Sequence, residues 1–316
     1  MELAIETKQL TKQYNSQPED MFAIQGISLE VPRGQLFGLI GPDGAGKTTT
    51  IRILSTAMKP SSGYAKIGGF DVDSQPEDAR LLIGYMPQAF SLYPDLNVIE
   101  NLGFIADIQG VSGSRKKERI GELLAFSRLD RFQERRSEHL SGGMRKKLAL
   151  ACALIHEPRV LLLDEPTTGV DPVSRRELWQ IISEVLLLGV SVLVSTPYMD
   201  EAERCHKVGI LNEGQILTMG SPKELTAQLP YQMMEIVARP RRITRQVINA
   251  TDGISAWRPV GDRIRMAVEE PGKVEKKLRS AFKKTTGEIR ILRQAKPIMD
   301  DVFIHLVESS GAENEV

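Results

Sequence analysis

The chain has 316 residues, and its 41 basic and 41 acidic side chains leave no net charge. Its length suggests two domains with ample chain for a sizeable core, while the balanced charge points to no particular class of partner. Two cysteines are too few for a disulfide framework, and no run approaches 18 uninterrupted apolar residues, so we expect a reducing compartment and no membrane-spanning segment.

The N-terminal segment has no basic-then-apolar signal pattern, so we expect a cytoplasmic protein whose membrane role comes through a partner. Leu3–Thr7 and Ala23–Val31 alternate as strands do, and a polar loop joins them. Tyr14 lies at the mouth of this loop, where its ring could stack on an adenine. Packing is the commoner role of a lone loop tyrosine.

A glycine-rich turn follows the apolar run Gln35–Ile40 and precedes a helical segment, Thr49–Leu54. The turn, Gly41–Thr48, fits G-x-x-x-x-G-K-[ST], in which backbone N–H groups and a helix N-terminus bind phosphate oxygens. Lys47 would reach the β- and γ-phosphates, and the Thr48 hydroxyl would complete a Mg²⁺ shell. The nucleotide-contacting residues that we expect here are Gly41, Pro42, Asp43, Gly44, Ala45, Gly46, Lys47, Thr48 and Thr49.

The next segments predict short strands over 64–72 and another over Ile83–Gln88. The side chain of Gln88 has a donor and an acceptor, so it could hold a water molecule or Mg²⁺ beside a nucleotide. From Asn97 to Pro158 the apolar pattern is helical and lacks sustained heptads. Within this block, Ser141 and the two glycines after it begin a helix, which is either an anion site or an ordinary N-cap.

The apolar strand Val160–Leu163 ends on Asp164 and Glu165, where a phosphoryl-transfer site places its second half. Asp164 would hold Mg²⁺ through water, and Glu165 would polarise the attacking water. Two adjacent acids more often mean only a polar strand end, but these follow a phosphate loop. Asp171 lies in the next turn, before a helix that we expect to end near Leu188.

A further strand at 190–194 and a hairpin over 208–218 close the first domain. After Pro230 the composition changes, and strand-like segments alternate with a basic helix near 272–282 in an α+β arrangement without a catalytic constellation. Between Tyr231 and Asp300 there are sixteen Lys/Arg and eight Asp/Glu. This excess suits anionic lipid, a partner or a solvated helix face equally well.

Taken in this order, the motifs make the first 230 residues resemble an ATP-binding cassette (ABC) transporter subunit. The resemblance implies an α/β fold, namely a P-loop NTPase cassette over residues 1–229. This cassette has a RecA-like core, an antiparallel β subdomain and a helical subdomain at about 97–158, and a small α+β domain follows at 230–316. It also implies ATP and Mg²⁺ as cofactors and catalytic roles for Glu165, Gln88 and Lys47, with Thr48, Gln88 and Asp164 at the metal.

The resemblance further implies an ATP-sandwich dimer, in which the phosphate loop of one chain faces the Leu-Ser-Gly-Gly motif of another. In this dimer Tyr14 would stack on adenine, Gln88 would link the nucleotide to a membrane partner, and Asp171 would contact the second cassette. The motif that would act on the other chain's γ-phosphate consists of Leu140, Ser141, Gly142, Gly143 and Met144.

The ending 300–306 is similar to that of cassette subunits from bacterial drug- and antibiotic-efflux exporters. We therefore expect an ATPase at the cytoplasmic face of the inner membrane. Its expected partners are integral-membrane permease chains and a second cassette chain, identical or different, and no nucleic acid. An alternative is a soluble cassette ATPase acting on ribosomes or nucleic acid, although one cassette without a coiled-coil insertion does not favour it. A third possibility is a regulatory, ATP-dependent dimerisation clamp.

Two positions depart from the family pattern. Asp43 stands where asparagine is usual, although its carboxylate can point away from the phosphates. Pro197 stands where the family has a histidine that hydrogen-bonds the γ-phosphate, and proline has neither a side-chain donor nor an N–H. We expect His206 on the following helix, as a surface residue and not a substitute. Losing such a contact costs about 10²–10³ in rate, so we expect good ATP binding and weak hydrolysis.

Overall fold

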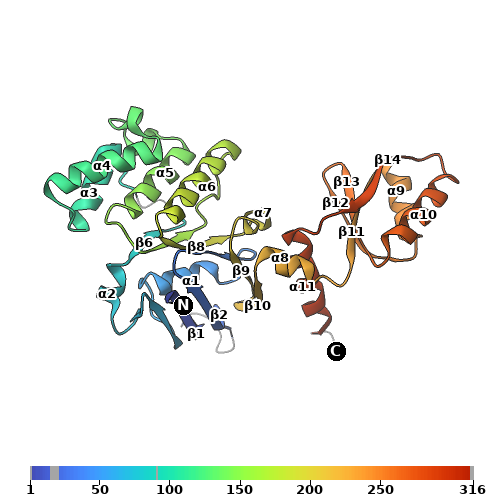
Figure 1. The fold of residues 1–316 in the computed structure, drawn as a ribbon, viewed down its shortest axis with the longest axis horizontal. Coiled ribbons are helices and arrows are strands. Elements are labelled where there is room, and N and C mark those ends of the chain that lie inside the picture. Colours follow the sequence, from blue (N-terminus) through green and yellow to red (C-terminus); the bar gives the residue numbers. More distant parts are fainter. Residues whose placement is uncertain (1, 15–20, 90–91, 314–316) are drawn as a thin grey trace. The chain divides into compact units, whose positions relative to one another are not determined.

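The computed structural model describes residues 2–14, 21–89 and 92–313, and the chain divides into two compact units, Met1–Ser221 and Pro222–Val316 (Figure 1). The division falls before helix α8 (Pro222–Ala227), which we had assigned to the first domain. Helix α8 packs against helix α11 (Met299–Glu313), and this contact between segments far apart in the sequence places α8 in the second unit.

The first unit is built around a six-stranded sheet with the strand order β10-β9-β3-β8-β7-β6. All neighbours in it pair in parallel except β9 and β10, which form the predicted hairpin. Its strands are β3 (Leu36–Ile40), β6 (Ile83–Met86), β7 (Val160–Asp164), β8 (Ser191–Thr196), β9 (Lys207–Asn212) and β10 (Gln215–Gly220). Every residue of β3, β7 and β8 is buried, because a parallel sheet has both faces covered.

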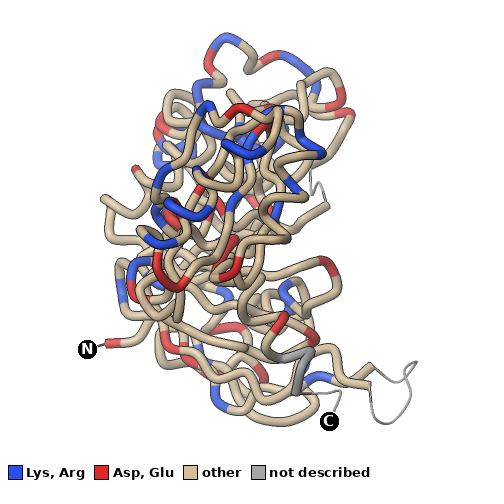
Figure 2. The backbone as a smooth tube through the Cα atoms, turned by 90° about the vertical axis from the view of Figure 1, so that its right-hand side faces the viewer, with Lys and Arg blue, Asp and Glu red and all other residues tan. Residues whose placement is uncertain are grey.

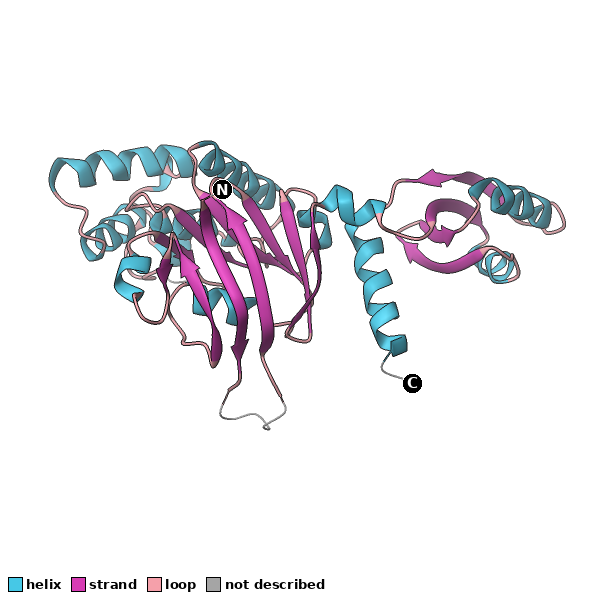
Figure 3. Ribbon diagram, turned by 60° about the horizontal axis from the view of Figure 1, so that its bottom comes forward, coloured by secondary structure: helices cyan, strands magenta, loops and turns pink. Residues whose placement is uncertain are grey.

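A second, antiparallel sheet with the order β2-β1-β4-β5 packs in the same unit (Figure 3). Its strands are β1 (Leu3–Lys12), β2 (Ile24–Pro32), β4 (Ser62–Ile67) and β5 (Phe70–Asp71). One buried core joins both sheets through side chains such as Ile5, Ile27 and Phe37, together with Ile51 from helix α1 (Lys47–Leu54). Packing of Ile51 in this core holds α1 against the sheet, next to the carboxyl end of β3.

Helices form the remainder of the first unit. They are α2 (Pro76–Arg80), α3 (Val98–Ile108), α4 (Gly113–Ser127), α5 (Gly142–Ala153), α6 (Pro172–Leu187) and α7 (Met199–Ala202). Asn97 begins α3 with a capping box, because its side chain accepts from the Glu100 N–H and the Glu100 carboxylate accepts from the Asn97 N–H. The expected helical block therefore comprises α3, α4 and α5, with two short 3₁₀ turns before α5.

The second unit contains a β-α-β-β-α-β arrangement with the sheet order β12-β13-β11-β14, all antiparallel, which is the ferredoxin-like topology. Its elements are β11 (Gln232–Arg239), α9 (Arg241–Asn249), β12 (Ile254–Val260), β13 (Arg263–Val268), α10 (Pro271–Phe282) and β14 (Glu288–Ala295). Helices α9 and α10 bury one face of this sheet through Val247, Ile248, Leu278 and Phe282.

The sequence patterns predicted β11, β13, α10 and β14 but missed α9, β12 and α11. Helix α9 has a short apolar stripe among six basic or polar residues, and the side chains of β12 show little alternation because all of them are at least partly exposed. Charged residues of both signs are interspersed along the chain (Figure 2). In the described part of the chain, no helix has the length and apolarity that crossing a bilayer requires.

Candidate active site

The phosphate loop connects β3 to α1 and is held by close backbone packing. Gly46 precedes α1 with a φ of 100°, and a Cβ placed there would lie 2.5 Å from the Ala23 carbonyl oxygen. At Gly41 a Cβ would lie 2.0 Å from the Leu211 carbonyl oxygen. Only glycine fits such approaches, so the loop conformation depends on neighbours that are distant in the sequence.

Lys47 is the first residue of α1, and its side chain is 3% exposed. Its Nζ donates hydrogen bonds of 2.8 Å to the carbonyl oxygens of Gly41 and Pro42. The same atom lies 3.5 Å from Glu165 Oε1. The ammonium group is therefore positioned among the loop carbonyls, and the nearest counter-charge is the carboxylate that the sequence analysis singled out.

Asp164 ends β7 opposite Thr48 of α1. Its Oδ1 accepts hydrogen bonds from Thr48 Oγ1 at 3.1 Å and from Ser195 Oγ at 2.7 Å. Its Oδ2 is buried and has no hydrogen-bond partner among the described residues. Burial raises the pKa of this carboxyl group, and the two hydroxyl donors oppose the shift. A hydroxyl beside a carboxylate with one oxygen left over is a donor set that suits the hard, oxygen-binding Mg²⁺ ion.

Glu165 follows β7 in a left-handed conformation, with a φ of 48°. Its backbone N–H donates to Ser195 Oγ at 3.0 Å, and its Oε2 accepts from Gln88 Nε2 at 2.8 Å and from Thr168 Oγ1 at 3.1 Å. The carboxylate is 4% exposed. Because three neighbours fix it, Glu165 is held beside Lys47 in one orientation.

Lys146 of α5 is a residue of this site that the sequence analysis missed. Its Nζ donates to the carbonyl oxygens of Gln88 at 3.0 Å and Glu165 at 3.4 Å, and burial lowers the pKa of its ammonium group. It belongs to the run Arg145–Lys147, which reads as a solvated helix face. No spacing signal marks it, since these two acceptors are backbone carbonyls.

A cavity of about 820 Å³ opens beside the phosphate loop. Most of the predicted nucleotide residues line it: Tyr14, Asp43, Gly44, Gly46, Lys47, Thr48, Thr49, Gln88 and Glu165. The Tyr14 hydroxyl lies 3.2 Å from Thr49 Oγ1, so the ring stands over the beginning of α1. Asp43 is exposed at the tip of the loop. The cavity therefore combines an aromatic ring, the phosphate loop and the Glu165 carboxylate.

The Leu140–Met144 motif does not line this cavity. Ser141 caps α5, its Oγ accepting from the Met144 N–H at 3.2 Å, which is the ordinary N-cap considered above. A Cβ at Gly143 would lie 2.2 Å from Ser174 Oγ, so this glycine allows α5 and α6 to approach closely. Asp171 caps α6 and accepts from two backbone N–H groups at 3.0 Å.

Pro197 directly follows β8, whose last residue, Thr196, accepts a 3.4 Å hydrogen bond from the Gly41 N–H. The Thr196 hydroxyl accepts from the Tyr198 N–H at 3.1 Å. His206 lies in the bend before β9 and not on α7, and its Nδ1 accepts from the Leu36 N–H at 3.0 Å. Since Leu36 is at the amino end of β3, His206 is at the edge of the sheet opposite the phosphate loop.

Glu201 of α7 is fully buried and connects three segments around this site. Its Oε1 accepts from Thr167 Oγ1 at 2.7 Å, Arg175 Nε at 2.7 Å and Trp179 Nε1 at 2.9 Å. Its Oε2 accepts from Thr196 Oγ1 at 2.6 Å. Sequence patterns do not identify Glu201, because it lies in an acidic stretch, Asp200–Glu203, that resembles a surface helix start.

The comparisons with known proteins agree with this geometry. Residues 24–168 match the family model described as "ABC transporter". The chain is 40% identical over 295 residues to the probable multidrug ABC transporter ATP-binding protein YbhF of Escherichia coli, covering 92% of this chain and 50% of YbhF. It is 33% identical over 308 residues to the daunorubicin/doxorubicin resistance ATP-binding protein DrrA of Streptomyces peucetius, covering 96% of this chain and 92% of DrrA.

A solved structure of the ATP-binding subunit of an ABC transporter is 32% identical, with a TM-score of 0.64, and covers 71% of this chain and 92% of that one. This chain spans half the length of YbhF but nearly all of DrrA. The predicted α/β cassette fold is confirmed by these likenesses together with the parallel sheet and phosphate loop. The chain belongs to the ABC transporter ATP-binding proteins.

Proposed function

We propose that this chain binds and hydrolyses ATP to energise a membrane exporter through separate permease chains, at the cytoplasmic face of the inner membrane. The observation that carries the ATPase assignment is the meeting of Lys47, Thr48, Asp164 and Glu165 at the carboxyl ends of β3 and β7. A transporter of drugs and a drug-resistance protein among the relatives support export, because uptake would not confer resistance.

Each side chain has a distinct task in this proposal. Lys47 exchanges its bonds to the loop carbonyls for the β- and γ-phosphate oxygens. Thr48 and Asp164, whose Oδ2 has no partner among the described residues, would hold Mg²⁺, and the ion would neutralise charge on the phosphates. Glu165, kept in place by Gln88, orients the attacking water and accepts its proton.

The Leu140–Met144 motif acts on a second cassette chain in this proposal. It does not line the cavity of its own chain, and Ser141 begins a helix whose N-terminal end favours an anion. Asp171 then lies at the contact between the two cassettes. Gln88 connects the bound nucleotide with a permease chain, since its backbone carbonyl and its side chain both contact active-site residues.

We further propose that this chain's own hydrolytic site is weak, because the residue that directly follows β8 offers no donor to the γ-phosphate. Pro197 has none, the Tyr198 N–H bonds to Thr196, and the Thr196 hydroxyl bonds to Glu201. A preorganised donor is worth about 10²–10³ in rate. ATP binding is retained, because Lys47 and the loop amides remain. A different cassette chain with a complete site would then supply the faster turnover.

Phosphate release by the purified chain at saturating MgATP tests the weak site. We expect little turnover by the wild type and a gain of about 10²-fold in Pro197→His. Pro197→Ala is the matched control, since it restores the backbone N–H of this position without adding a side-chain donor, and it should stay slow. Rapid wild-type turnover that Glu165→Gln abolishes would contradict the weak site and favour a homodimer.

Co-purification from membranes tests the exporter assignment. We expect a tagged chain to retain integral-membrane permease chains, and we expect Lys47→Ala to lose binding of a fluorescent ATP analogue. Recovery of ribosomes or DNA in place of permeases would overturn the assignment. Dimerisation in ATP without phosphate release in any partner combination would instead identify a regulatory clamp, which Pro197 favours.

A further inference from the structure

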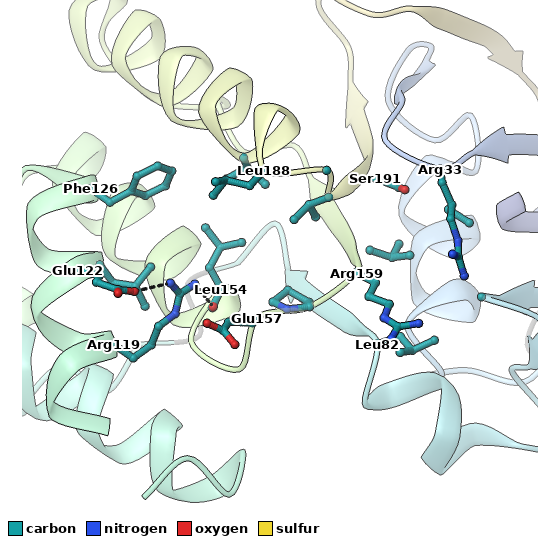
Figure 4. A pocket seen from close by; sticks show the side chains of 18 residues that line it. Arg33, Leu82, Arg119, Glu122, Phe126, Leu154, Glu157, Arg159, Leu188 and Ser191 are labelled. Carbon is teal, nitrogen blue, oxygen red and sulfur yellow. Dashed lines mark hydrogen bonds and ion pairs between the residues drawn. The ribbon is translucent and has the colours of Figure 1, made fainter. Parts of the chain in front are cut away.

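A second cavity, of about 670 Å³, lies in the first unit at the edge of the central sheet opposite the phosphate loop (Figure 4). Its wall includes Val160 and Ser191, which begin β7 and β8, whereas Asp164 and Thr196 end these strands beside the nucleotide residues. The volume falls within the range of about 300–1,000 Å³ that small-molecule sites occupy. The proposed ATPase mechanism uses none of its residues.

One side of this cavity is apolar. Leu123 and Phe126 of α4, Leu154 after α5 and Val185 of α6 line it, with Leu188 at the rim. Leu188 is 74% exposed, and Figure 4 shows Phe126, Leu154 and Leu188 on the same side of the space. Leu123, Leu154 and Val185 are already buried, so an apolar body placed here would remove mainly Phe126 and Leu188 from water.

The other side contains a positive charge without a counter-ion. Arg159 makes no side-chain hydrogen bond or ion pair with any described residue, and Figure 4 shows it across the cavity from Phe126. The other charged side chains of the wall are paired: Arg33 with Glu2, Arg119 with Glu122, which also lines the cavity, and Glu157 with Arg115. The uncompensated guanidinium selects an anion.

Ser191 supplies a second polar group to the same side. Its side chain is buried, with 1% of the residue exposed. Its Oγ accepts a 2.9 Å hydrogen bond from the Gly34 N–H, and its own proton has no acceptor in the described part of the chain. A buried hydroxyl with an unused proton gains a hydrogen bond when an anionic oxygen arrives.

We propose that this cavity binds a medium-chain carboxylic acid. The carboxylate pairs with the Arg159 guanidinium and accepts from the Ser191 hydroxyl, while the alkyl chain lies along Phe126, Leu154 and Leu188. An inorganic anion would leave the apolar wall in water, and a neutral alkane would leave the charge unpaired. Only an amphipathic anion satisfies both sides of the cavity.

Titration calorimetry of the full chain with decanoate, below its micellar concentration, tests the proposal. We expect one decanoate per chain, with decan-1-ol and decyltrimethylammonium binding at least tenfold more weakly. Arg159→Gln should weaken decanoate binding about ten- to a hundredfold, the range for a hydrogen bond to a charged group. Arg242→Gln is the matched control, because it removes an equally exposed charge from the second unit and should bind as the wild type does.

A second variant tests the apolar side. Phe126→Ala should weaken decanoate binding about tenfold while leaving the preference for an anion intact. Equal binding of decanoate by Arg159→Gln and the wild type would overturn the proposal. Decan-1-ol binding as tightly as decanoate would also overturn it, because the cavity would then be an apolar surface without a head-group site.

Discussion

Replacing Glu201 by glutamine tests whether this residue organises the segments around the active site. The carboxylate is fully buried and accepts from Thr167, Arg175, Trp179 and Thr196. Glutamine has nearly the same size, but one of its two terminal groups is a donor and it carries no charge. It therefore cannot accept from all four neighbours, and the Arg175 guanidinium loses its buried counter-charge.

The expected loss in the free energy of unfolding is about 3 kcal/mol. Breaking a buried pair by removing one partner costs about 3–5 kcal/mol, and hydrogen bonds to charged groups are worth about 1.5–3 kcal/mol each. The retained amide oxygen of Glu201→Gln recovers part of this. For a unit of this size, 1 kcal/mol corresponds to about 2–4 °C, so we expect the first unit to melt about 6–12 °C lower.

Differential scanning calorimetry measures this shift, with Asp200→Asn as the matched control. Asp200 pairs with the same arginine through Arg175 Nη2, at 2.8 and 2.9 Å, but its side chain is 69% exposed. Exposed pairs contribute less than about 1 kcal/mol, so the control should melt within about 3 °C of the wild type. Equal melting of Glu201→Gln and Asp200→Asn would refute the central role of the buried carboxylate.

Three further predictions concern other sites. Burial raises the pKa of Asp164, so the ionised form of this carboxyl group opposes folding. Asp164→Asn should therefore have a higher melting temperature than the wild type at neutral pH. The difference should vanish in acid, where the wild-type carboxyl is protonated in both the folded and the unfolded state. Gly46→Ala should lower the melting temperature and ATP affinity, since its Cβ would lie 2.5 Å from the Ala23 carbonyl oxygen. Asp301→Asn should lower the melting temperature of the second unit by several degrees and leave ATP binding unchanged, because Asp301 Oδ2 accepts from Arg265 Nη2 at 2.6 Å within that unit.

Each of these predictions has a measurement and a contrary outcome. For Asp164→Asn, a difference in melting temperature that grows toward acid would show that the native state favours the ionised carboxylate. For Gly46→Ala the control is Gly44→Ala, because Gly44 also has a positive φ, of 80°, but no atom within 4 Å of a Cβ. Equal losses of melting temperature and ATP affinity in Gly46→Ala and Gly44→Ala would mean that the strain of a positive φ causes them and that the approach to the Ala23 carbonyl oxygen does not. For Asp301→Asn, a loss of ATP affinity would mean that the two units are energetically coupled.

Much of the candidate active site could be predicted from the sequence, because its parts are contiguous. The residues from Gly41 to Thr48 are consecutive, and the acids Asp164 and Glu165 directly follow an apolar run. Short spacings of this kind define a strand end or a helix start by themselves. The sheet then joins the two parts, because the carboxyl ends of parallel strands meet at one edge.

The tertiary structure alone decided the features that depend on distant contacts. Lys146 and Glu201 have partners that are far away in the sequence or are backbone carbonyls, so no periodicity identifies them. Helix α8 joins the second unit only because α11 returns to it. His206 was expected on a helix but lies in a bend, where the Leu36 N–H is its partner.

The sequence thus determined the phosphate loop, the acidic strand end and the family resemblance, since each is local. The structure decided the Glu201 connections and the second cavity. It also decided that Asp164 Oδ2 and the Arg159 side chain have no partner among the residues that it describes. Burial and pairing depend on which segments meet in space, and a linear pattern records only which residues could meet. The local motifs could therefore be predicted from the sequence, whereas the buried contacts between distant segments could not.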